Sequence, residues 1–146
     1  MTTRTRLQEV ENRLKKHGVR FTHGRRAVVE ALRESSGPKS AAALHTMVSP
    51  QVPMSSLYRT LTIFVDCEIV AVHFSGKGLA RYELAEWLTG HHHHLLCINC
   101  GSVDDIEIPP EEELKIQRSV EQIGAFASFI PSSHALEIEG RCAKCL

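Results

Sequence analysis

The sequence is organised around residues 91–101, which read HHHHLLCINCG, and around a second cysteine pair near the end of the chain. Two residues separate Cys97 from Cys100, and two residues separate Cys142 from Cys145. A spacer of this length lets both sulfurs of a pair face one ion, and two pairs complete the tetrahedral shell of a structural zinc site. Buried free cysteines and two disulfides are the alternatives. The paired spacing favours zinc.

Four consecutive histidines, residues 91–94, precede the first cysteine pair. If they form a strand, their side chains alternate between two faces, so His91 and His93 lie on one side and His92 and His94 on the other. Neutral imidazole is a common ligand of zinc and similar ions. Each pair is therefore a candidate half of a metal site that carboxylates from elsewhere would complete. A solvated polar loop or a purification tag is the alternative.

The charges are unevenly distributed along a chain whose formal net charge is zero. Residues 1–60 contain 11 Lys and Arg against 4 Asp and Glu, whereas residues 61–146 contain 6 against 13. We therefore expect the first part to meet a polyanion and the second part to bind cations. The sequence has no apolar run of membrane-spanning length and no signal peptide, and its thiols suit a reducing compartment. These features predict a cytoplasmic protein without a membrane partner.

Apolar residues at helical spacing predict helices over residues 4–17, from the N-cap Thr22 to the break at residues 35–38, over 41–48 after the cap Ser40, and over 55–65. The last two helices and their tight connection are typical of a helix-turn-helix. On the final helix, hydroxyls suit phosphate contacts and one arginine suits guanine. A core-edge aromatic and a solvated arginine are the alternative interpretation. The candidate DNA-contacting residues of this helix are Ser55, Ser56, Tyr58, Arg59 and Thr62.

Two strand-like runs, residues 69–74 and 79–84, flank a turn and predict a β-hairpin, which would be the wing of a winged helix with Lys77 at its tip. The predicted organisation is a DNA-binding domain at residues 1–85, a hinge at 86–90 and a dimerisation domain at 91–146.

The second domain is predicted to contain a strand over residues 103–108, a helix over 111–122 that Gly124 ends, and strands over 125–130 and 134–139. A unit this small has little room for a core, which favours completion by dimerisation. The fold class is α+β.

Several segments together resemble the ferric uptake regulator (Fur) family of bacterial metal-responsive repressors. They follow the family's order over nearly the whole chain, and the combination is specific although each piece alone is weak. The matching segments are residues 14–22 with Arg25, Leu57 to Leu61, Arg81 to Leu84, the His-rich cysteine segment and the terminal cysteine pair.

The resemblance implies a homodimer that binds a palindromic DNA operator with a metal as corepressor. Tyr58 and Arg59 would lie on the recognition helix, and Arg20 near the minor groove. The resemblance also implies three metal sites. These are a structural zinc at Cys97, Cys100, Cys142 and Cys145, a sensing site with Glu83, His92 and His94, and a second site with His91, His93, Glu112 and His134. Strand alternation divides the four histidines in the same way.

The chain also departs from the family pattern. Many members have a histidine just before the third helix, where this chain has Pro38 and Lys39, and no cysteine lies between Glu68 and Leu96. The fourth ligand of the sensing site is therefore open. Asp66 is the first choice, and Cys67, His73 and Asp105 follow. The sensed ion is Fe(II) or Zn(II), with Mn(II) also compatible, and a sulfur ligand from Cys67 would favour zinc.

The expected mechanism is a clamp, in which one ion joins ligands from both domains and so sets the separation of the two recognition helices in the dimer. Repression of metal-uptake genes follows from it. The alternatives are a zinc-dependent metallohydrolase and a zinc-ribbon DNA-binding adaptor that does not sense metal.

Overall fold

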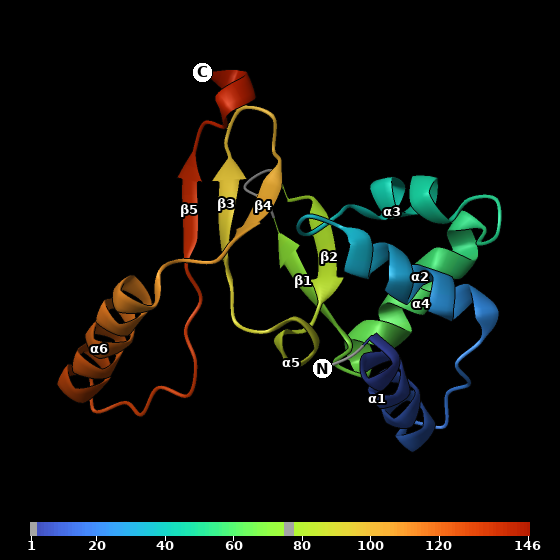
Figure 1. Cartoon of the computed structure of the whole chain (residues 1–146), viewed down its shortest axis with the longest axis horizontal. Coiled ribbons are helices and arrows are strands. Elements are labelled where there is room, and N and C mark those ends of the chain that lie inside the picture. Colours follow the sequence, from blue (N-terminus) through green and yellow to red (C-terminus); the bar gives the residue numbers. More distant parts are fainter. Residues whose placement is uncertain (1–2, 75–77) are drawn as a thin grey trace. The chain divides into compact units, whose positions relative to one another are not determined.

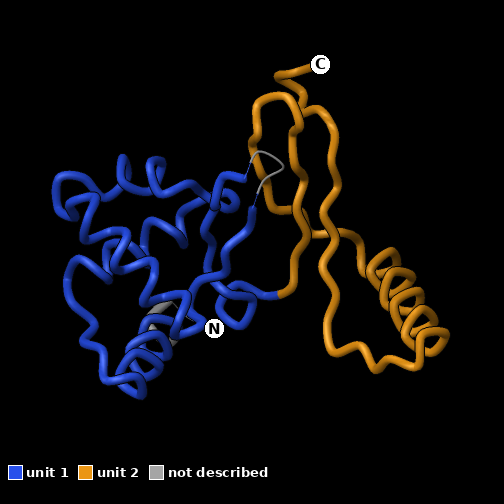
Figure 2. Tube along the Cα trace, turned by 180° about the vertical axis from the view of Figure 1, so that it is seen from behind, with its two compact units in different colours: residues 1–90 blue, residues 91–146 orange. Residues whose placement is uncertain are grey.

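The computed structural model describes residues 3–74 and 78–146, so the predicted wing tip at Lys77 lies outside the described residues. The chain divides into two compact units, residues 1–90 and residues 91–146 (Figure 2). Within the described ranges, every helix is too short or too polar to cross a membrane.

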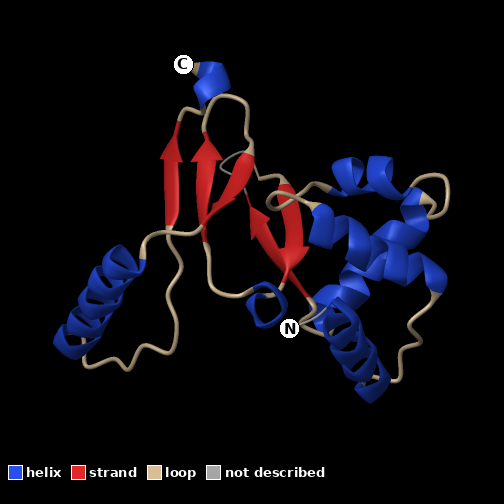
Figure 3. Ribbon diagram, in the orientation of Figure 1, coloured by secondary structure: helices blue, strands red, loops and turns tan. Residues whose placement is uncertain are grey.

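The first unit consists of four helices, a two-stranded antiparallel sheet and one more helical turn (Figures 1 and 3). The caps predicted at Thr22 and Ser40 are confirmed, because their hydroxyls accept the backbone N–H groups of Arg25 (3.4 Å) and Ala43 (3.2 Å). This order of elements is a winged helix. Its elements are α1 (Thr3–Lys16), α2 (His23–Glu34), α3 (Ala41–Val48), α4 (Met54–Asp66), β1 (Val70–Phe74), β2 (Ala80–Leu84) and α5 (Glu86–Thr89).

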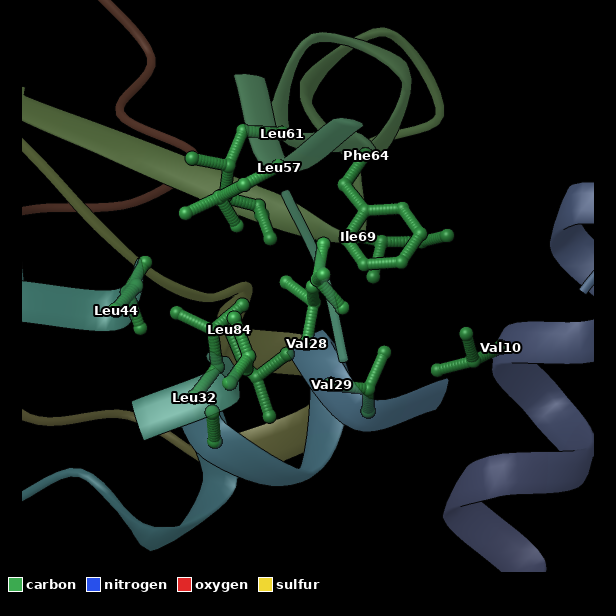
Figure 4. Packing of buried hydrophobic residues seen from close by; sticks show 14 of the residues in the cluster. Val10, Val28, Val29, Leu32, Leu44, Leu57, Leu61, Phe64, Ile69 and Leu84 are labelled. Atoms are coloured by element: carbon green, nitrogen blue, oxygen red, sulfur yellow. The ribbon is translucent and has the colours of Figure 1, made fainter. Parts of the chain in front are cut away.

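An aliphatic core holds the first unit together (Figure 4). Val28 and Leu32 of α2 pack with Leu57 and Phe64 of α4, and all four side chains are buried. Burying one such side chain stabilises a fold by about 1.5–3 kcal/mol relative to leaving it exposed. Because α4 turns its apolar face into this core, its polar face is left at the surface.

The residues expected to form a hinge are the helical turn α5, which belongs to the first unit. Leu88 joins the core, and the indole N–H of Trp87 donates to the carbonyl of Glu68 (2.7 Å). Arg13 of α1 stacks over the Trp87 ring (4.9 Å to its centroid) and donates from Nε to the carbonyl of Cys67 (2.8 Å). The segment is thus tied to α1 and to the end of α4, and its role as a hinge stays a prediction.

The second unit is a three-stranded sheet with one long helix. The sheet order is β4-β3-β5, and β3 runs antiparallel to β4 but parallel to β5. Its elements are β3 (His93–Cys97), β4 (Val103–Ile106), α6 (Pro110–Phe126), β5 (Glu137–Gly140) and a 3₁₀ turn (Ala143–Cys145).

The predicted strand over residues 125–130 is wrong. Gly124 does not end α6, which continues to Phe126, and the chain then reverses through Ser128 in the left-handed region (φ 53°). Phe126 and Ile130 are 94% and 93% exposed, so their apolar character reflects no core of this single chain. Apolar residues alone cannot distinguish a buried strand from such an exposed helix end. The last strand is also shorter than predicted, since β5 begins at Glu137.

The second unit has little apolar core among the described residues. Its buried apolar side chains are Leu96, Cys97 and Val103, whereas the large cluster of buried hydrophobic residues lies in the first unit. Ile123 and Phe129 are both 67% exposed. Stability must therefore come from other sources, such as metal ligation and a partner subunit.

Gly124 is expected to resist substitution although it lies in a helix. A Cβ atom there would lie 2.6 Å from the carbonyl oxygen of Phe129 and 2.7 Å from Cδ of Pro131. Gly124→Ala should therefore destabilise by about 1–3 kcal/mol through overpacking, instead of the usual gain of roughly 0.5–1 kcal/mol for Gly to Ala in a helix. Thermal unfolding followed by circular dichroism measures this difference.

The matched control is Gly24→Ala in α2, where the nearest atom, on Val52, is at an ordinary 3.6 Å. We expect the control to keep or raise the unfolding midpoint. Equal unfolding midpoints for the two variants would show that the turn after α6 adjusts to the added methyl group without a loss of stability.

Candidate metal sites and DNA-binding helix

The four cysteines form one cluster at the end of the three-stranded sheet, with every pair of sulfurs within 4.8 Å. All four are free thiols rather than disulfides. The Sγ atoms of Cys100 and Cys142 are 3.8 Å apart. Tetrahedral zinc with Zn–S bonds of about 2.3 Å requires sulfurs about 3.8 Å apart, so the cluster fits this ion. Gly101, in the left-handed region (φ 71°), forms the turn after the first pair.

The thiols of this cysteine cluster share a polar environment. Hydrogen bonds from the backbone N–H groups of Cys100 and Cys142 lower the pKa of Cys97 to about 6. Asn99 lowers the pKa of Cys145 through a hydrogen bond, but the neighbouring Cys142 thiol and burial outweigh it and raise that pKa to about 11. Four sulfurs so close together cannot all carry charge without a cation, and a divalent ion would stabilise every thiolate.

A second cluster, called here the Glu113 cluster, consists of His91, His93, Glu113 and His134. The Nε2 atoms of the three histidines lie 3.2, 2.8 and 3.0 Å from the Glu113 carboxylate, in that order. The His93 side chain is 1% exposed, and its hydrogen bond to Glu113 is the main cause that lowers the pKa of this carboxyl. Three imidazoles and one carboxylate aimed at a common point are a suitable donor set for a divalent ion.

The prediction of Glu112 in this cluster is wrong, because the structure places Glu113 there instead. Glu112 is half exposed and pairs with Lys115, one turn along α6, at 2.7 Å. Neighbouring residues of a helix point about 100° apart, and the sequence does not define the rotation of α6 relative to the sheet. The position of Glu113 was therefore not accessible to sequence reasoning.

A third cluster, called here the Asp105 cluster, lies on the other face of β3 and comprises His92, His94 and Asp105. The Nε2 atoms of His92 and His94 lie 3.9 and 3.6 Å from Oδ1 of Asp105. Antiparallel pairing sets His94 directly opposite Asp105. The alternation predicted for the four histidines holds, since the His91 and His93 rings meet at 4.7 Å and the His92 and His94 rings at 5.1 Å.

Asp105, rather than the first choice Asp66, lies beside the two histidines. Asp66 is the last residue of α4 in the first unit, whereas Asp105 shares a sheet with both histidines. Cys67 is buried in the core of the first unit, and burial raises the pKa of its thiol. It therefore behaves as a small apolar core residue. The Asp105 cluster contains nitrogen and oxygen donors and no sulfur.

Two further candidates, Glu83 and His73, lie in the hairpin of the first unit. Glu83 is on β2 with a side chain 11% exposed, and its Oε1 contacts Nε2 of His73 on β1. Both residues thus belong to the unit that also carries α4.

The candidate DNA-binding residues of α4 share one exposed face, because Leu57, Leu61 and Phe64 occupy the buried face. Tyr58 is 52% exposed. The Thr62 hydroxyl donates its proton to the Tyr58 carbonyl (3.0 Å), so towards DNA the Thr62 oxygen can act only as a hydrogen-bond acceptor. Arg20 is exposed on the link between α1 and α2. The exposed face consists of Ser55, Ser56, Tyr58, Arg59 and Thr62.

A winged helix with an exposed polar recognition face, joined to a unit that carries clusters of metal-ligand residues, defines the class of metal-responsive DNA-binding regulators. The family model "Ferric uptake regulator family" matches residues 16–138. The chain belongs to this family. It is a metal-dependent transcriptional repressor that acts on DNA as a homodimer, and it is not an enzyme. Neither the metallohydrolase nor the adaptor without metal sensing is favoured.

Relatives align along nearly their whole length. The ferric uptake regulation protein of Bacillus subtilis (strain 168) is 30% identical over 145 residues, which cover 96% of this chain and 94% of that protein. The peroxide operon regulator of the same organism is 31% identical over 143 residues, with coverage of 95% and 92%. The Helicobacter pylori ferric uptake regulator, a structure described with three functional metal-binding sites, superposes with a TM-score of 0.78 at 25% identity, covering 99% of this chain and 94% of that one.

Proposed function

We propose that the Asp105 cluster, completed by Glu83 from the winged helix, is the sensing site and that Fe(II) is its corepressor. The convergence of His92, His94 and Asp105 on one face of β3 is the observation that carries this proposal. An ion held by ligands from both units would restrain the angle between them. In a dimer that angle sets the spacing of the two recognition helices against successive major grooves.

The donor set accepts iron and lacks the thiolate that would favour zinc. Imidazole and carboxylate ligands suit Fe(II) and Mn(II), whereas zinc selection is strengthened by thiolate. Cys67 was the sulfur candidate for this site, and it is a core residue of the first unit. The similarity to the ferric regulator of Bacillus subtilis points in the same direction. Repression of metal-uptake genes in the cytoplasm is the corresponding biological role.

The other two clusters are assigned different roles. The cysteine cluster would hold a permanent zinc, because its four sulfurs lie within 4.8 Å of one another and the Cys100–Cys142 pair has the 3.8 Å spacing of a tetrahedral site. The Glu113 cluster would hold a second ion wholly within the dimerisation unit, where it joins β3, α6 and the segment that carries His134. That ion would stabilise the unit without restraining the winged helix. The Helicobacter pylori ferric uptake regulator is likewise described with three functional metal-binding sites.

DNA contact is assigned to the exposed face of α4 and to the link before α2. Arg59 would contact a base edge in the major groove, and the hydroxyls of Ser55 and Ser56 would contact phosphates. Arg20 would approach the minor groove beside the recognition site. Each residue is exposed, as such a contact requires.

Fluorescence anisotropy with a labelled operator at fixed salt tests the sensing role. The protein keeps its cysteine-bound zinc, is stripped of weaker metals and is titrated with buffered Fe(II), Zn(II) and Mn(II). We expect Fe(II) to raise DNA affinity at the lowest free concentration. Activation by Zn(II) at a lower free concentration would overturn the choice of metal, and no response to any ion would overturn the sensing site.

Peroxide response is the second candidate function, because the peroxide operon regulator is as similar to this chain as the ferric regulator is. The same anisotropy assay distinguishes the two after brief treatment of the metal-loaded protein with hydrogen peroxide. Loss of DNA binding that fresh metal does not restore would assign a peroxide regulator. Unchanged binding would leave the metal response as the function.

A further inference from the structure

The hairpin of the first unit contains a buried carboxylate with a histidine beside it. In the register of the antiparallel pair, His73 lies opposite Arg81, and Ala71 lies opposite Glu83. His73 and Glu83 are therefore diagonal neighbours on the same face of the hairpin, a separation that long side chains bridge. Their contact joins Nε2 of His73 to Oε1 of Glu83.

This contact matters because of what Glu83 is proposed to do. Its side chain is 11% exposed, and a carboxylate that is largely removed from water needs a partner to fix its charge and orientation. A carboxylate that binds a metal through one oxygen commonly accepts a hydrogen bond on the other. The contact with His73 is made by Oε1 of Glu83.

The neighbouring loop of the first unit offers no alternative imidazole. Ser36 to Lys39 contain no histidine, and the backbone of Lys39 is hydrogen-bonded in both directions to Tyr82 on β2 (2.9 and 2.8 Å). The Lys39 amine donates to the Ser36 hydroxyl (3.3 Å). The loop is thus fixed beside the hairpin and supplies no imidazole.

We propose that His73 is a positioning residue of the sensing site, which holds Glu83 in the orientation that engages the metal. The ion-pair contact between its Nε2 and Oε1 of Glu83 restrains that carboxylate, so the winged helix would meet the ion through a preoriented ligand. The proposal rests on the proposed role of Glu83 as a sensing ligand. The metal affinity of the sensing site would then depend on the β1–β2 hairpin as well as on the dimerisation unit.

The test compares His73→Ala with His73→Gln, because the glutamine side-chain amide can still donate near the position of Nε2. Metal affinity is measured by competition of buffered Fe(II) or Mn(II) with a chromophoric chelator, on full-length protein that retains its structural zinc. We expect His73→Ala to weaken the sensing site about 10–100-fold, and His73→Gln to recover most of that loss. The cobalt(II) absorption spectrum of the same site should change in the alanine variant and return in the glutamine variant.

The matched control is His17→Ala, which removes an exposed histidine at the end of α1. We expect it to leave metal affinity unchanged, and circular dichroism should show that all three variants are folded. Unchanged affinity in His73→Ala overturns the proposal, and so does a glutamine variant as weak as the alanine variant.

His92→Ala separates failure of this proposal from failure of the proposed function. Loss of metal-dependent DNA binding in His92→Ala together with normal metal affinity in His73→Ala refutes only the positioning role. Retention of metal-dependent DNA binding in His92→Ala refutes the sensing site on which the positioning role rests.

Discussion

Replacing Cys100 with serine is expected to unfold the C-terminal unit of this repressor and to split its dimer. The reason is the imbalance between the two units, since the described part of residues 91–146 buries few apolar side chains while the first unit has an extensive core. A structural zinc contributes an apparent binding free energy of about 10–16 kcal/mol in small zinc domains. That is comparable to the whole stability of an ordinary domain, about 5–15 kcal/mol.

Three measurements follow the effect of Cys100→Ser. Zinc content by colorimetric titration should fall to near zero, the dimer should dissociate on size-exclusion chromatography, and the unfolding of the C-terminal unit should disappear from the thermal transition. Removing zinc from the unaltered protein with a strong chelator should have the same result. Cys67→Ala is the control, because Cys67 is buried in the first unit and lies outside the cysteine cluster. If Cys100→Ser remained a folded dimer, zinc would not be what stabilises this unit.

Replacing His92 with alanine is expected to abolish the metal response and to leave the fold intact. Allosteric coupling of this kind is worth about 1–3 kcal/mol, so metal should raise the DNA affinity of the unaltered protein about 5–150-fold. His92 and His94 both face Asp105, and without the His92 imidazole the remaining ligands should hold the ion much more weakly. The variant should bind DNA with the same weak affinity at every metal concentration.

His91→Ala is the matched control for this experiment, because the two residues are adjacent in the chain but belong to different clusters. His91→Ala should keep metal-dependent DNA binding and lose metal only from the Glu113 cluster. Anisotropy titrations of both variants, with metal content determined in parallel, measure the difference. Equal loss of the DNA response in both variants would contradict the separation into a sensing site and a stabilising site.

Much of this protein was accessible from its sequence. Two Cys-x-x-Cys pairs predicted a four-sulfur cluster, since the spacing within each pair is local, and the fold brings the four sulfurs together. The alternation of residues 91–94 predicted the division of the histidines, although β3 begins only at His93. Helical periodicity and capping residues predicted α2 and α4, because these signals act within a few residues of each other.

Other features depended on how separate elements pack. Asp105 lies beside the histidines of β3 because β4 pairs with that strand in one register, whereas Asp66 is not among the described residues that gather there. Glu113 replaced Glu112 because the rotation of α6 about its axis is set by its packing. The apolar residues 125–130 read as a strand, yet they lie largely exposed at the end of a helix.

The sequence by itself determined the family, the types of metal ligand and the polar face of the recognition helix. These properties depend on the spacing of residues that are close together in the chain, and this spacing does not change with the packing of the rest of the chain. Only the tertiary structure decided which carboxylate lies beside each histidine pair. It also brought His73 into contact with Glu83. Ligands of one ion must meet within a few ångströms, and residues distant in the chain reach that separation only through strand register and helix rotation.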